Sequence, residues 1–114
     1  MSRWIFSGDG LVHVHREPPL PEPTFVAVQS LVAELEGSRA AMEDFLEVWR
    51  EYKYKNNPED ALVGNHCEIH IVGDQVHLYP LYDDEWGDIE DVWIPLDEVE
   101  EMFREYGAWA FGGS

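Results

Sequence analysis

The stretch HCEIHIVGDQVHLYPL, residues 66–81, decides the fold because it contains a complete β-hairpin. Polar and apolar residues alternate along both halves, which predicts two strands that each bury one face. Gly73 and Asp74 suit a two-residue turn, and a turn of that length sets the strand register. We therefore expect His70 to lie directly opposite His77. The expected core face holds Cys67, Ile69, Ile71, Val76 and Leu78, and the opposite, polar face holds His66, Glu68, His70, His77 and Tyr79.

Two further segments have strand patterns. Residues 3–16 predict a second hairpin, with turn-forming Ser, Gly and Asp at 7–10. Val12 and Val14 are expected on the buried face of its return strand, with two histidines on the other face. Closer to the C-terminus, residues 92–94 can form one more short strand.

The segment 24–55 carries two apolar stripes at helical spacing, interrupted at Gly37. Glycine suits the end of one helix, and the serine that follows suits the start of the next. We therefore favour two helices over one long helix, with Thr24 as the N-cap of the first. The preceding stretch, residues 17–23, contains four prolines and predicts a stiff, extended connection.

A C-terminal helix is also predicted. Asp97 and Glu100 have the spacing of a capping box, and Gly107 can close the helix. The apolar stripe of this helix consists of Val99, Met102, Phe103 and Tyr106. In the glycine-rich tail, Trp109 and Phe111 are expected to pack back on the sheet.

These elements predict a single α+β domain over residues 1–114. Its antiparallel sheet of about five strands would consist of the two hairpins and the short strand. The central helical segment and the C-terminal helix would cover one face of it. The composition fits a folded core, because hydrophobic residues make up 45% and aromatic residues 13% of the chain. Disordered acidic segments are poor in both.

The chain is strongly and unevenly acidic. Its 7 Lys+Arg against 24 Asp+Glu give a formal net charge of -17. Residues 1–55 have six basic and nine acidic side chains, whereas residues 56–114 have one basic and fifteen acidic. This balance excludes ordinary nucleic-acid binding, which needs Lys and Arg against phosphates, and it disfavours an anionic membrane surface. The favoured partner is cationic, either a basic protein or a metal ion.

The sequence predicts a cytoplasmic protein. Cys67 is the only cysteine, so no intramolecular disulfide can form. The N-terminus has no apolar run of signal-peptide length, and no stretch is apolar for long enough to span a bilayer.

The acidic stretch 83–91 is the most specific functional feature. Six of its nine residues are acidic, and Arg104 is the only base in this half of the chain. Large aromatic residues punctuate or flank it, and an acidic surround would steer a basic partner onto such anchors. The expected partner-binding residues are Asp83, Asp84, Glu85, Asp88, Glu90 and Asp91 for charge complementarity, with Tyr82 and Trp86 as anchors. The alternative is a solvated loop that keeps the protein soluble.

A metal site is a second hypothesis, because His66, His70 and His77 share the outer face of the hairpin. A solvent-facing side of an antiparallel sheet would hold the same histidines without any metal. We expect the protein to have no enzymatic activity and to bind no cofactor. Cys67 lies on the apolar face, away from the side chain of His66, and the sequence contains no phosphate-binding loop and no serine in a nucleophile motif.

The hairpin region 64–79 followed by the acidic stretch 83–91 resembles the small acidic YacL-type bacterial proteins of unassigned function. In size and charge the chain also resembles immunity proteins of polymorphic and contact-dependent-inhibition toxins. The second resemblance implies an antitoxin that inhibits a cognate toxin, often a basic nuclease, in the cytoplasm of the producing cell. Immunity proteins differ in fold, so no functional residue is carried over by position. A third hypothesis is an oligomeric structural or regulatory module that associates through the aromatic tail, and the sequence leaves the oligomeric state open.

Overall fold

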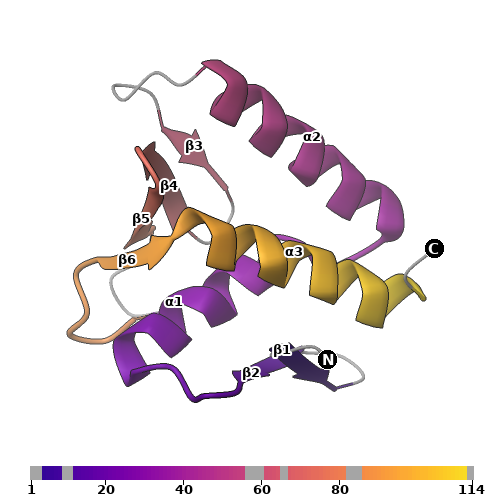
Figure 1. The fold of residues 1–114 in the computed structure, drawn as a ribbon, viewed down its shortest axis with the longest axis horizontal. Helices are drawn as coiled ribbons and strands as arrows, with labels where there is room; N and C mark the ends of the chain where they lie inside the picture. Colours follow the sequence, from indigo (N-terminus) through magenta and orange to yellow (C-terminus); the bar gives the residue numbers. More distant parts are fainter. Residues whose placement is uncertain (1–3, 9–11, 56–60, 65–66, 82–85, 113–114) are drawn as a thin grey trace.

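The computed structural model describes residues 4–8, 12–55, 61–64, 67–81 and 86–112. Its elements are β1 (Trp4–Ser7), β2 (His13–Arg16), α1 (Glu22–Ala33), α2 (Arg39–Lys55), β3 (Leu62–Val63), β4 (Cys67–Val72), β5 (Gln75–Pro80), β6 (Val92–Pro95) and α3 (Leu96–Phe111). They form an α+β fold in which helices pack on a four-stranded sheet (Figure 1). The predicted fold class is confirmed.

The strands form two antiparallel sheets rather than the single sheet of about five strands expected from the sequence. β1 pairs only with β2, and the order in the larger sheet is β3-β4-β5-β6. The N-terminal hairpin stays separate because it packs on helices, with β1 against α3 and β2 against α1. The expectation missed β3, whose two residues are too few to show alternation.

The register of β4 and β5 is the predicted one. Gly73 takes a φ of +64° in the turn, and His70 lies opposite His77. All the residues expected on the core face of this hairpin are buried, and so are Val12 and Val14 of the first hairpin. The faces are therefore set by the two-residue alternation of the strands.

The helical segment breaks at Gly37, as predicted. The φ of +122° there is a conformation that only glycine adopts without strain. The Ser38 hydroxyl accepts a hydrogen bond from the Ala41 N–H at 3.1 Å and so caps α2. Thr24 is not the N-cap of α1, because the helix already begins at Glu22. The N–H groups of a first helical turn have no partner within the helix, so Pro23 is accommodated there.

The capping box predicted for Asp97 and Glu100 does not form. α3 begins at Leu96 without a side-chain cap. The Leu96 N–H instead donates to the carbonyl of Asp74 at 2.8 Å, which satisfies one of the free donors of the first turn.

The end of α3 also differs from the expectation. Gly107 stays helical, since a glycine weakens a helix without breaking it. α3 continues to Phe111, and Gly112 ends it in a left-handed conformation at φ +81°. The ring of Trp109 lies 5.8 Å from that of Phe6, so this part of the tail packs on the N-terminal hairpin rather than on the larger sheet.

α1 and α3 cover one face of the larger sheet through contacts with β5 and β6. α2 contacts the sheet as well, because its Tyr52 hydroxyl accepts a hydrogen bond from the Ile71 N–H of β4 at 3.2 Å, and its aromatic side chains also pack on α3. The rings of Trp49 and Phe103 meet edge to face there, with 4.9 Å between their centroids. The predicted stripe of α3 is buried as a whole and consists of Val99, Met102, Phe103 and Tyr106.

Candidate functional site

The face of the larger sheet that points away from the helices carries polar and aromatic side chains. Strand alternation brings residues of β4, β5 and β6 together on it, namely Glu68, His70, His77, Tyr79 and Trp93. We call these residues the open face. Within the described ranges no helix lies over it (Figure 1), and Trp93 is 49% exposed.

The open-face side chains form a connected row across three strands. The ring of Tyr79 lies 5.5 Å from that of His70 and 4.3 Å from that of His77. The indole of Trp93 stacks on His77 with 3.8 Å between centroids and 15° between planes. At the other end of the row, Glu68 lies 2.7 Å from Nε2 of His70. These contacts hold the side chains in place, although the surface faces solvent.

Asp91, the last residue of the acidic stretch, is tied to this row. Its carboxylate lies 2.6 Å from Nε2 of His77, and the Tyr79 hydroxyl lies 3.1 Å from Nδ1 of the same ring. A carboxylate accepts hydrogen bonds, so we assign the proton to Nε2 and let Nδ1 accept from the phenol. Both ring nitrogens of His77 are then engaged, and neither offers a lone pair to a metal ion or a substrate.

The arrangement of these side chains does not support the hypothesis of a metal site. His70 and His77 face each other, but Nε2 of each ring is bonded to a carboxylate, Glu68 or Asp91. In the part of the chain that the structure describes, no three His, Cys, Asp or Glu side chains form a group that could hold a metal ion. The third predicted ligand, His66, lies outside the described residues.

The acidic stretch is described from Trp86 to Asp91. The Ile89 N–H donates to the Trp86 carbonyl at 3.2 Å and closes a turn, from which Asp88 and Glu90 are exposed. The other residues predicted to bind a partner lie outside the described residues: Tyr82, Asp83, Asp84 and Glu85.

Trp86 is not the exposed anchor that the sequence suggested. It is 2% exposed, and its indole N–H donates to the Ser30 hydroxyl on α1 at 2.8 Å. Burial of the large apolar ring is favourable because it removes apolar surface from water, and the indole N–H, its one polar group, keeps a hydrogen bond. Trp86 therefore attaches the acidic stretch to α1. The exposed aromatic side chain beside the described acidic residues is Trp93.

The sequence does contain a signal for the position of Trp93. This residue lies between Val92 and Ile94, and both of these are buried in β6. Alternation along the strand then places the indole on the opposite face. The residues around Trp86 have no comparable periodicity, so nothing local predicts its burial.

Cys67 lies fully buried on the core face, as predicted. The carboxylate of Glu34 accepts hydrogen bonds from the Cys67 backbone N–H at 3.2 Å and from its thiol at 3.7 Å. The same carboxylate passes so close to Gly64 that a Cβ atom there would overlap with it. This buried carboxylate satisfies the backbone N–H of Cys67 at the start of β4, and the thiol of Cys67 is not accessible to solvent.

Comparison of the chain with protein-family models, with curated proteins and with solved structures found no match. Among the helices of the described ranges, none has both the length and the apolar character needed to cross a membrane. The function is therefore inferred from the chemistry of the open face and the acidic stretch.

Proposed function

We propose that this protein binds a basic protein through the open face and the neighbouring acidic stretch. In this proposal it acts in the cytoplasm as an immunity protein that neutralises a basic toxin, such as a nuclease, by covering the toxin's active site. One observation carries the proposal: Asp91 of the acidic stretch bonds to His77, and the ring of His77 stacks on the exposed Trp93. Negative charge and an aromatic anchor thus share one continuous surface.

The charge distribution supports a basic partner. Residues 56–114 have one basic side chain against fifteen acidic ones, and Asp88 and Glu90 are exposed beside the open face. Such a field accelerates the approach of a cationic protein and weakens as salt is added. A nuclease has to present positive charge to phosphates, so an acidic surface is complementary to its substrate-binding groove.

The chemistry of the open face supports recognition of arginine. The faces of indole and phenol rings attract a guanidinium group, and Trp93 and Tyr79 offer such rings. The carboxylate of Glu68 lies at one end of the row and that of Asp91 beside His77, and both can accept guanidinium N–H groups. Tryptophan and tyrosine are also the residues that most often dominate binding energy at protein interfaces.

The test is capture of partners from a lysate of the source cells by the immobilised protein, followed by mass spectrometry. The wild type is compared with Trp93→Ala and with the triple variant Asp88→Asn, Glu90→Gln, Asp91→Asn. We expect the wild type to retain a basic protein at about 0.15 M salt. The triple variant should lose it, and Trp93→Ala should weaken its binding by about tenfold or more.

A matched control removes the same number of carboxylates from α2, through Asp44→Asn, Glu47→Gln and Glu51→Gln, all of which are exposed. This control should retain the partner. If both triple variants bind equally, or if the captured protein is acidic, the proposed surface is wrong. If a captured toxin keeps its full activity in an equimolar complex, neutralisation is excluded although binding stands.

A further inference from the structure

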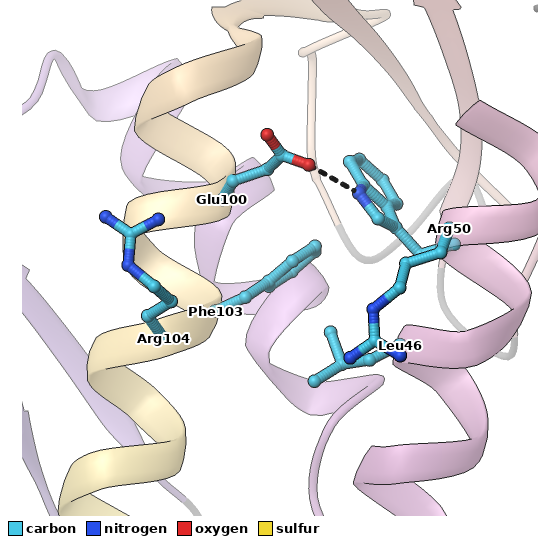
Figure 2. Close-up of a pocket in the computed structure, with 6 residues that line it drawn as sticks. Leu46, Arg50, Glu100, Phe103 and Arg104 are labelled. Atoms are coloured by element: carbon cyan, nitrogen blue, oxygen red, sulfur yellow. Dashed lines mark hydrogen bonds between the residues drawn. The ribbon is translucent and has the colours of Figure 1, made fainter. Parts of the chain in front are cut away.

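The helices α2 and α3 form a groove on the helical side of the molecule. It has a volume of about 260 Å³, and it is lined by Leu46, Trp49 and Arg50 of α2 and by Glu100, Phe103 and Arg104 of α3 (Figure 2). Trp49 and Phe103 are buried, and Leu46 is half-buried, so the floor of the groove is apolar.

Two arginines, Arg50 and Arg104, line this groove next to its apolar floor. Figure 2 shows Arg104 and Arg50 on opposite sides of Phe103. Neither guanidinium group forms an ion pair with another described residue, whereas Arg16 and Arg39 each pair with a glutamate. In a chain with 24 Asp+Glu and only 7 Lys+Arg, it is unusual that two guanidinium groups with no ion pair among the described residues line one groove, where an external anion could pair with them.

The one carboxylate among the lining residues, Glu100, is already neutralised. Nζ of Lys53 donates to both of its oxygens, at 3.0 and 2.8 Å, and Nε1 of Trp49 donates to Oε2 at 3.2 Å. Burial raises the pKa of Glu100, but these hydrogen bonds and the charges of Lys53 and Arg104 outweigh burial and hold it below its ordinary value. The direct ion pair of Glu100 is thus formed with Lys53, and Arg104 acts on this carboxylate only through its charge, so the N–H groups of Arg50 and Arg104 are not used by Glu100.

We propose that this groove binds a small organic carboxylate with an aromatic or branched aliphatic body. Guanidinium groups pair with carboxylates through parallel N–H···O bonds, and the apolar floor would cover the body of the ligand. The volume lies just below the range of about 300–1,000 Å³ that is typical of pockets for drug-sized ligands, so the occupant is small. The net charge of -17 repels a polyanion more than a monoanion, which disfavours nucleic acids and acidic peptides. This site does not depend on the proposed function.

Phenylacetate is a suitable probe, and its uncharged amide, phenylacetamide, is the matched ligand control. Both are titrated at low salt into the isotope-labelled protein and followed by NMR. Phenylacetate should shift the indole N–H of Trp49 and the amides of Leu46 and Phe103 in a saturable way, with a Kd of about 1 mM for a ligand of this size. Phenylacetamide should bind about tenfold or more weakly.

Protein variants give the second arm of the test. Arg50→Gln and Arg104→Gln should each weaken phenylacetate binding by about tenfold, because each removes a charged donor. Lys55→Gln removes the same charge from the exposed end of α2 and should leave the Kd unchanged. The proposal is overturned if the shifts do not saturate by about 20 mM, if they map outside the groove, if the amide binds equally well, or if the arginine variants bind like the wild type.

Discussion

Replacing the two tryptophans nearest the described acidic residues by alanine should have different effects: Trp86→Ala should mainly reduce stability, and Trp93→Ala should mainly weaken partner binding. Trp86 is 2% exposed, and a buried tryptophan replaced by alanine destabilises a protein by about 3–5 kcal/mol. About 1 kcal/mol of this belongs to the hydrogen bond with Ser30. A domain of this length has a free energy of unfolding of about 6–17 kcal/mol, so Trp86→Ala removes a substantial part of it. Trp93 is 49% exposed, and its replacement should destabilise by about 1–2 kcal/mol while weakening partner binding.

Urea unfolding followed by circular dichroism measures both values, with the m-value as a check that the unfolded states are comparable. In thermal melts, Trp86→Ala should lower Tm by about 12–20 °C, at about 4 °C per kcal/mol. A double-mutant cycle of Trp86→Phe with Ser30→Ala isolates the hydrogen bond and should give a coupling of about 1 kcal/mol. The reasoning is refuted if Trp93→Ala destabilises the protein more than Trp86→Ala, because Trp86 would then not be the buried attachment of the acidic stretch.

Three further substitutions, each at one position, test other parts of the structure. Gly37→Ala should lower the free energy of unfolding in urea by about 1–3 kcal/mol, since its φ is +122°, and an unchanged midpoint would contradict a break in the helices there. Gly64→Ala should destabilise by about 1–3 kcal/mol, because the new methyl group displaces the Glu34 carboxylate from the buried N–H of Cys67; hydrogen exchange at that amide would report the loss. The folded-state pKa of Glu100 is below its ordinary value of 4.5, so its carboxylate stabilises the fold above that pH, and this contribution disappears as the pH falls through the lower value. Stability measured in urea should therefore fall less steeply below about pH 5 in Glu100→Gln than in the wild type, and parallel curves would refute the pKa shift.

Features that depend on neighbouring residues could be predicted from the sequence. The turn at Gly73 and Asp74 set the register of β4 and β5, and the alternation of the strands set their buried faces. Gly37 marked the boundary between two helices because its backbone conformation is strained for other residues. Each of these signals acts within a few residues, so one sequence is sufficient to recognise it.

Features that depend on distant contacts could not be predicted. The separation of the N-terminal hairpin from the larger sheet is decided by the surfaces of α1 and α3. The burial of Trp86 depends on Ser30, which lies 56 positions earlier in the chain. The groove between α2 and α3 also escaped prediction, since Arg50 and Arg104 come together only when the two helices pack. The candidate site was thus predictable in part, because strand alternation defines the open face and places Trp93 on it, whereas no local pattern indicates that Trp86 is buried.

The row of rings on the open face has a thermodynamic consequence for complex formation. Immobilising a flexible side chain at an interface costs about 0.5–1.5 kcal/mol. His77 is held from three sides, by Asp91, Tyr79 and Trp93, so most of its rotamer freedom is already lost in the unbound protein. The proposed partner would therefore meet a rigid surface, and its affinity would be set by how well its own surface matches the open face rather than by rearrangement of the open face.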